Sequence, residues 1–176
     1  MTLTVDGYRF DFPLAVDAYK FDETEKSHNN YHGVQQLKAV DVMVEFPKCY
    51  LWVEIKTYDD LQVFDGDAVC PNCGATVNHR QWLKRNLIHK YRDTFLYRFC
   101  EKKLDKPVLY VCLLNFDSAL LTFFKKELSQ GIPAGKPNPK RWKRSLLEKM
   151  HLIVTDEAGW NRNLNAYGSC QFVGLR

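Results

Sequence analysis

The sequence contains no hydrophobic run long enough to cross a membrane. Its longest apolar stretch, Val108 to Leu114, is far shorter than the roughly 20 residues that a transmembrane helix needs. The first residues, Met1 to Phe12, also lack the basic segment followed by an apolar segment that marks a secretory signal peptide. We therefore expect a soluble cytoplasmic protein that does not bind membranes.

The motifs of several common enzyme classes are missing as well. There is no glycine-rich phosphate loop, no dinucleotide-binding fingerprint and no Ser, His and Asp in the order of a catalytic triad. Internal repeats and low-complexity tracts are absent too. The chain has 176 residues, of which 45% are hydrophobic and 26% charged, as in an ordinary globular domain. We expect one domain spanning 1–176.

Acidic and basic residues are unevenly distributed along the chain. Residues 1–69 contain 13 Asp/Glu and 6 Lys/Arg, a net charge of −7, whereas residues 70–176 contain 8 and 19, a net charge of +11. Chance surface charge can produce such a division. It is also the pattern expected where acids gathered for a metal lie beside cations gathered for a polyanion.

Hydrophobic patterning predicts an α/β fold in which helices flank a mixed β-sheet. Strands are expected at 3–10, 39–46, 50–57, 108–114 and 151–155, and helices at 13–26, 80–103 and 118–130, with a short helix near Pro139. The strand at 108–114 lacks alternation, so it should be buried on both faces. Residues 58–79 form an inserted loop between the third strand and the long helix.

The two strands around residue 47 are expected to form a hairpin that brings acids together. If the hairpin loop has two residues, Asp41 lies directly opposite Glu54, with Cβ atoms about 5 Å apart. Lys56 shares their face because it lies two residues beyond Glu54. A three-residue loop would instead turn Asp41 to the other face. Carboxylates this close repel each other unless a hard cation such as Mg²⁺ lies between them.

The segments V-D at 40–41 and V-E-I-K at 53–56 resemble the motif of the PD-(D/E)XK nuclease superfamily, which has the restriction-endonuclease-like fold. That family places a helix before the hairpin, and a helix and a buried strand after it, and residues 12–116 look similar. Val40 stands where the name-giving proline would be, a position that varies in the family. The resemblance implies that Asp41 and Glu54 bind Mg²⁺ or Mn²⁺ and that Lys56 assists hydrolysis.

Many members of that superfamily add an acid from the helix before the hairpin. Glu25 continues the apolar stripe of the helix expected at 13–26, so it should point inward as a further catalytic residue. Asp22 and Glu23 are rivals for this position, and a solvated helix end is the alternative.

Cys70 and Cys73, in the segment C-P-N-C-G, have the spacing of half a zinc knuckle. A closed site needs four ligands. His79 is the nearest further candidate, and the fourth ligand would come from His89, Cys100 or Cys49. The alternatives are a remnant knuckle with free thiols and a redox pair.

Two clusters of basic residues are candidates for binding nucleic-acid phosphates. Residues 80–106 contain nine Lys/Arg against three acids, and residues 136–149 contain six against one. Lys84 and Arg85 represent the first cluster, and Lys140 and Arg141 the second, where Trp142 could stack on a base. The alternative is a solvated helix face with Trp142 packed inward.

These features together predict a Mg²⁺-dependent nuclease that hydrolyses phosphodiester bonds in nucleic acid, with DNA as the first expectation. The alternatives are a catalytically inactive nucleic-acid-binding derivative of the same fold and a zinc-knuckle protein-interaction module. The sequence shows no separate sequence-reading domain. Specificity is therefore expected from loops, from a homodimer or from a protein partner.

Overall fold

The centre of the protein is a mixed five-stranded β-sheet. The computed structural model describes residues 1–34, 36–58, 67–69, 74, 76–135, 140–142 and 146–174. The strand order in the sheet is β3 (Asp17–Lys20), β4 (Val42–Glu45), β5 (Tyr50–Lys56), β8 (Val108–Leu114) and β9 (Leu152–Thr155). The first three strands are antiparallel, and the last three are parallel. This arrangement confirms the expected α/β class.

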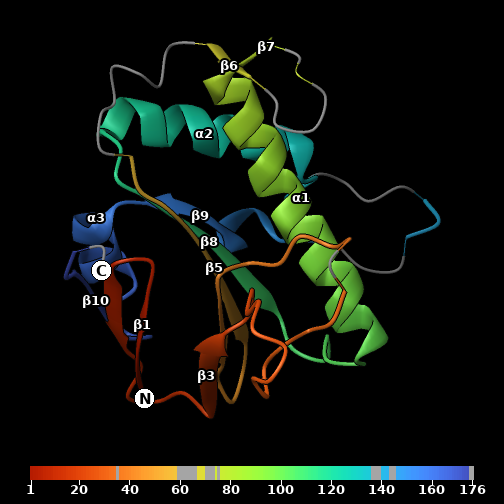
Figure 1. The fold of residues 1–176 in the computed structure, drawn as a ribbon, viewed down its shortest axis with the longest axis vertical. Helices are drawn as coiled ribbons and strands as arrows, with labels where there is room; N and C mark the ends of the chain where they lie inside the picture. Colours follow the sequence, from red (N-terminus) through yellow and green to blue (C-terminus); the bar gives the residue numbers. More distant parts are fainter. Residues whose placement is uncertain are drawn as a thin grey trace.

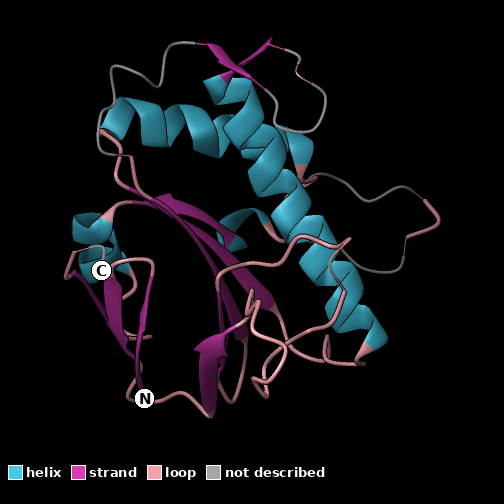
Figure 2. Cartoon of the chain, viewed as in Figure 1, coloured by secondary structure: helices cyan, strands magenta, loops and turns pink. Residues whose placement is uncertain are grey.

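Different layers cover the two faces of this sheet (Figures 1 and 2). Two helices, α1 (His79–Cys100) and α2 (Ser118–Gly131), pack on one face. The other face is covered by a small three-stranded sheet and by α3 (Glu157–Asn163). The small sheet consists of β1 (Thr2–Val5), β2 (Tyr8–Asp11) and β10 (Ser169–Phe172). The central strands are consequently buried on both sides, and every residue of β8 is buried, as its lack of alternation predicts.

The remaining elements are short. Strands β6 (Asp67–Val69) and β7 (Thr76–Asn78) pair antiparallel next to the start of α1, and a 3₁₀ turn covers Lys149–His151. None of the helices described in the structure is long and apolar enough to span a bilayer.

Several predicted elements are confirmed close to their expected bounds. The hairpin, the long helix, the buried strand and the last predicted strand correspond to β4–β5, α1, β8 and β9. Asp117 caps α2, because its side chain accepts a hydrogen bond of 2.8 Å from the backbone N–H of Leu120. The expected short helix near Pro139 falls largely outside the described residues.

The prediction of a single strand at 3–10 is wrong, because the chain reverses there. Asp6 and Gly7 both have positive φ values, 46° and 79°, which are typical of a two-residue hairpin turn. The turn separates β1 from β2, whose register pairs Val5 with Tyr8. Helix α3 and strand β10 were not predicted from the sequence.

The prediction of a helix at 13–26 is wrong as well. Residues 17–20 form the edge strand β3, in which Lys20 pairs with Val42 of β4. The expected apolar stripe is not buried as one face, because Leu14 is 67% exposed and Phe21 is buried. The open edge of β4 offers unpaired backbone groups. Pairing with them stabilises a strand at residues 17–20 more than the weak helical pattern stabilises a helix. The helix that the superfamily resemblance implies before the hairpin is therefore replaced by a strand.

Candidate active site

The β4–β5 hairpin has the geometry that the sequence predicts. Its loop has two residues, and the N–H of Phe46 donates a 2.9 Å hydrogen bond to the carbonyl of Cys49. The register pairs Val42 with Val53, so the preceding residue, Asp41, lies opposite Glu54. Asp41 is 1% exposed and Glu54 is fully buried. Two carboxyl groups thus face each other inside the protein, on the side of the sheet that α1 covers.

Lys56 completes the trio expected on this face. Its Nζ lies 2.7 Å from Oε1 of Glu54 and 3.8 Å from Oδ2 of Asp41. It also donates a 2.7 Å hydrogen bond to the carbonyl of Ile55. The backbone N–H of Ile55 in turn donates to Oδ2 of Asp41 at 2.6 Å. The hairpin alone therefore positions both acids and the lysine.

Lys90 of α1 is a further member of the site that sequence reasoning missed. Its Nζ lies 2.9 Å from Oδ1 of Asp41, 3.2 Å from Oε2 of Glu54 and 3.7 Å from Oδ2 of Asp22. The helix carries its buried face at Leu83, Leu87 and Tyr91. Lys90 lies beside this apolar stripe, where a lysine has little access to water. A cation at the margin of a buried helix face is the signal that could have identified it.

The structure brings Asp22 to the site instead of Glu25. Asp22 follows β3 closely and reaches Lys90, whereas Glu25 is exposed and accepts a 2.6 Å hydrogen bond from the hydroxyl of Ser27. Glu25 would point inward only from the helix expected at 13–26, and the structure has strand β3 there instead. Asp22, the alternative acid, lies just after the end of β3, where the chain leaves the sheet close to Asp41. We call Asp22, Asp41, Glu54, Lys56 and Lys90 the acid–lysine cluster.

Burial and charge strongly perturb the ionisation of this cluster. Burial, followed by the negative charge of Asp41, raises the pKa of Glu54 to about 8 and that of Asp22 to about 7. Burial by itself would lower the pKa values of Lys56 and Lys90, but the neighbouring carboxylates outweigh it and raise both. Both lysines are therefore cations at neutral pH, and Glu54 retains a proton that a stronger cation could displace.

Both oxygens of Glu54 are buried and lie within ion-pair distance of a lysine. Nζ of Lys56 is 2.7 Å from Oε1, and Nζ of Lys90 is 3.2 Å from Oε2. A hard cation such as Mg²⁺ is usually held by one or two carboxylates together with water and phosphate oxygens, and the facing pair Asp41 and Glu54 is suited to such an ion. Among the described residues, no group of three or more His, Cys, Asp or Glu side chains is arranged to hold a metal ion.

The expected zinc ligands Cys70 and Cys73 lie outside the described residues. His79 begins α1, and the expected fourth ligands are not near it. Cys100 ends the same helix, about 30 Å away, and His89 is about 15 Å along it. Cys49 is buried on the opposite face of the central sheet. A zinc site in this segment stays a prediction, and its fourth ligand would have to come from elsewhere.

The expected phosphate-binding residues occupy two surfaces. Lys84 and Arg85 line a cavity of about 480 Å³ between α1 and α2, where Lys84 forms an ion pair with Glu127. Lys140 and Arg141 are exposed, and Trp142 beside them is 45% exposed rather than packed inward. Arg85 and the 140–142 segment are therefore accessible to a polyanion, while Lys84 is already partly neutralised.

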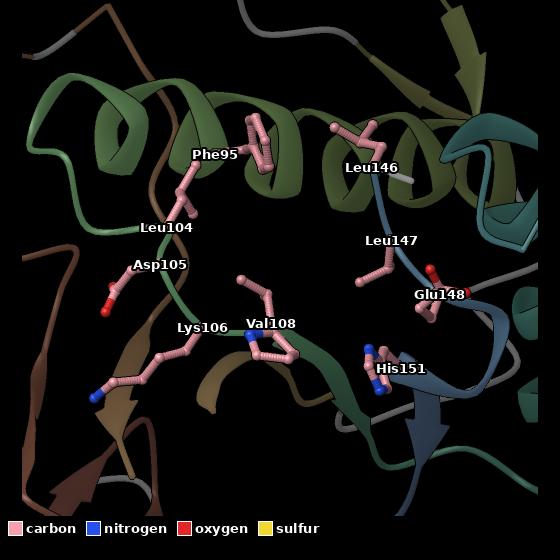
Figure 3. A pocket seen from close by; sticks show the side chains of 10 residues that line it. Phe95, Leu104, Asp105, Lys106, Val108, Leu146, Leu147, Glu148 and His151 are labelled. Carbon is pink, nitrogen blue, oxygen red and sulfur yellow. The ribbon is translucent and has the colours of Figure 1, made fainter. Parts of the chain in front are cut away.

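Another cavity, of about 300 Å³, lies at the amino end of β8 (Figure 3). Apolar side chains, among them Phe95, form much of its wall. Two of its charged residues already have partners, since Asp105 accepts a hydrogen bond from Tyr50 and Lys106 forms an ion pair with Glu45. Asp41 and Glu54 do not line this cavity, so it does not compete with the acid–lysine cluster as a reaction centre.

Comparisons with known proteins identify no relative of this chain. No protein-family model, no curated protein and no solved structure matches it.

Proposed function

We propose that this protein is a metal-dependent nuclease of the PD-(D/E)XK type, which hydrolyses phosphodiester bonds in nucleic acid, with DNA as the expected substrate. The observation that carries the proposal is the buried pair Asp41 and Glu54, joined by Lys56 on one hairpin. The long helix and the buried strand after the hairpin agree with the restriction-endonuclease-like arrangement. The edge strand β3 in place of the first helix departs from it.

The acids would provide the metal site. Asp41 and Glu54 would hold Mg²⁺ or Mn²⁺, with Asp22 as a further oxygen donor on the side of the edge strand. Such an ion lowers the pKa of bound water and withdraws charge from a phosphoryl oxygen. Glu54 must lose its proton to take part, so metal binding is coupled to proton release from this residue.

The lysines would act as fixed positive charges. Because the pKa of Lys56 is raised, its ammonium keeps its proton at neutral pH and is unsuited to remove one from water. Its ammonium can instead orient the attacking water or stabilise the negative charge that develops on the phosphate. Lys90, which reaches the same acids from α1, can contact the phosphate as a second cation.

The energetic cost of the acid–lysine cluster argues against an inactive derivative. Replacing buried ion pairs by apolar side chains of similar volume often leaves stability unchanged or higher. A buried arrangement of two facing carboxyl groups and two lysines therefore gains little for the fold. It becomes useful once a cation and a phosphate enter. The exposed Arg85, Lys140 and Arg141 would add attraction for the nucleic-acid backbone.

Cleavage assays on the purified chain test this proposal. Labelled single-stranded DNA, duplex DNA and RNA are incubated with Mg²⁺, Mn²⁺, Ca²⁺ or EDTA. We expect cleavage with Mg²⁺ or Mn²⁺, and a loss of about 100-fold or more in Asp41→Asn, Glu54→Gln and Lys56→Met.

The matched control is Glu45→Gln. Glu45 lies on the same strand face as Asp41, but at the other end of β4, where it pairs with Lys106. This variant should retain full activity. Wild-type protein that cleaves none of these substrates, or an active Asp41→Asn variant, would refute the nuclease assignment.

A further inference from the structure

A cleft opens directly beside the acid–lysine cluster. It has a volume of about 470 Å³, and Asp22 and Lys90 form part of its wall. The cleft therefore shares two residues with the cluster. Its outer wall comes from the segment between β3 and β4, coloured orange in Figure 1, which runs beside α1. We call this cavity the Tyr31 cleft, after the aromatic residue in that wall.

The aromatic wall of the cleft packs against a residue of α1. The rings of Tyr31 and His32 are stacked, with centroids 6.2 Å apart and an interplanar angle of 25°. The ring of Tyr97 meets His32 edge-on at 5.5 Å, and its hydroxyl donates a 3.1 Å hydrogen bond to the carbonyl of His32. Tyr31 itself is half-buried, so its ring is supported by His32 and still borders the cleft.

The supporting histidine is uncharged at neutral pH. Burial lowers the pKa of His32, and its Nδ1 accepts a 3.2 Å hydrogen bond from the N–H of Val34. The proton of the neutral ring is then on Nε2. Two neutral, stacked rings present an apolar surface, which favours a flat neutral group such as a nucleobase over a metal or a free anion.

A cation also lines the cleft. The ammonium of Lys38 donates a 2.7 Å hydrogen bond to the amide oxygen of Asn86, and the backbone N–H of Lys38 is fixed by Asp93 on α1 at 3.0 Å. Both Lys38 and Asn86 line the cleft. The cleft thus contains an aromatic surface and an ammonium group, and it shares Asp22 and Lys90 with the acid–lysine cluster.

We propose that the Tyr31 cleft binds one unpaired nucleotide of a single-stranded nucleic acid, with its base on Tyr31 and a phosphate near Lys38. This inference rests on the proposed function, because it makes the nucleotide the neighbour of the bond that the cluster would cleave. The cavity volume is near the lower end of the roughly 300 to 1,000 Å³ found for small-ligand sites, which suits one nucleotide and is too small for a duplex. Bases stack on an aromatic ring only when they are unpaired and splayed from a helix.

Binding measurements with Ca²⁺ or EDTA test the inference without requiring cleavage. Fluorescence anisotropy compares a labelled oligothymidine with a hairpin duplex of the same length. Tyr31→Ala should weaken binding of the single strand about tenfold or more, since it removes a base-stacking surface. Tyr31→Phe, which keeps the ring, should bind within about twofold of the wild type. Duplex binding should be unchanged in both.

Two further variants complete the experiment. Phe99→Ala, in an exposed aromatic residue near the end of α1, is the matched control and should have no effect. Lys38→Gln should reduce the slope of log affinity against log salt by about 0.7 for the single strand, as expected for one lost phosphate contact. Thermal unfolding of each variant shows that the fold is retained.

The outcomes separate this inference from the nuclease assignment. A Tyr31→Ala variant that binds the single strand like the wild type, or that loses duplex binding equally, overturns the inference. If the protein cleaves nothing but still binds single strands in a Tyr31-dependent manner, the nuclease assignment fails and the cleft stands as a nucleotide site.

Discussion

The two faces of the central sheet are both buried, yet they differ in chemistry. On the face toward α3 and the small sheet, the strands contribute apolar side chains such as Val53 and Ile55, which pack around Trp160. On the face toward α1, the same strand β5 presents Glu54, and Asp41 lies opposite. Because side chains alternate between the faces along a strand, Glu54 on one face is followed directly by Ile55 on the other.

Both faces hold apolar clusters that stabilise the fold, but the face toward α1 also holds the buried acids. The apolar face, toward α3, gains free energy from burial without a buried carboxyl group to compensate. The face toward α1 must in addition offset the desolvation of Asp41 and Glu54 with Lys56 and Lys90. Changes at apolar positions of either face should mainly affect stability, and changes at Asp41, Glu54 and Lys56 should mainly affect metal binding and activity.

The largest contrast is expected between two neighbours on β5. Ile55→Ala should lower the free energy of unfolding by about 2–5 kcal/mol, because it leaves a cavity in the apolar face. Glu54→Gln should retain or raise stability, since it removes a repelling acid, while it abolishes cleavage. Urea denaturation and cleavage assays on both variants measure this contrast. If Glu54→Gln destabilises the protein as much as Ile55→Ala does, the comparison between the faces is wrong.

A smaller effect is expected for the helix lysine that compensates the acids. Lys90→Met should lower the stability of the metal-free protein at pH 8 by about 1–3 kcal/mol, because buried carboxylates lose a charged partner. Added Mg²⁺ should restore part of this loss. Lys84→Met, on the same helix in a more exposed ion pair, is the control and should cost less than about 1 kcal/mol. Melting curves with and without Mg²⁺ check this, and equal losses for the two variants would contradict it.

A further effect is a pH dependence of the metal-free protein. The pKa of Glu54 is about 8 in the folded state, against an ordinary value of 4.5. Between these two pH values the folded state therefore holds a proton that the unfolded state has lost. Stability should therefore fall as pH rises from about 5 to 8, by at most about 1.4 kcal/mol per pH unit for one group. Glu54→Gln should flatten this slope, whereas Glu45→Gln should preserve it. Urea denaturation in EDTA at several pH values measures the slope, and stability that rises with pH across this window would oppose the assignment.

Local patterns predicted the hairpin and its facing residues well. The two-residue loop fixes which residues of β4 and β5 lie opposite each other, and side chains alternate between the two faces along each strand. The sequence alone therefore predicts that Asp41, Glu54 and Lys56 lie together. The buried strand β8 and the capped helix α2 were also predictable, because continuous apolar runs and caps are local signals. The restriction-endonuclease-like assignment and the zinc site stay predictions.

The residues that surround Asp41 and Glu54 could not be predicted in the same way. Residues 13–26 have a weak helical stripe, and only the open edge of β4 makes residues 17–20 a strand. That change moved the third acid from Glu25 to Asp22. Lys90 and the Tyr31 cleft depend on how α1 and the 31–39 segment pack over the sheet, which no local spacing encodes.

The sequence by itself determined the register of two carboxyl groups and a lysine, because hydrogen bonding between adjacent strands allows few alternatives once the turn is set. Only the tertiary structure decided what faces them. Long-range packing brought Lys90 within ion-pair distance of Asp41, Glu54 and Asp22, and it removed Asp41 and Glu54 from bulk water. Burial and close charges depend on contacts between segments far apart in the chain, so the raised pKa of Glu54 is a property of the fold rather than of the motif.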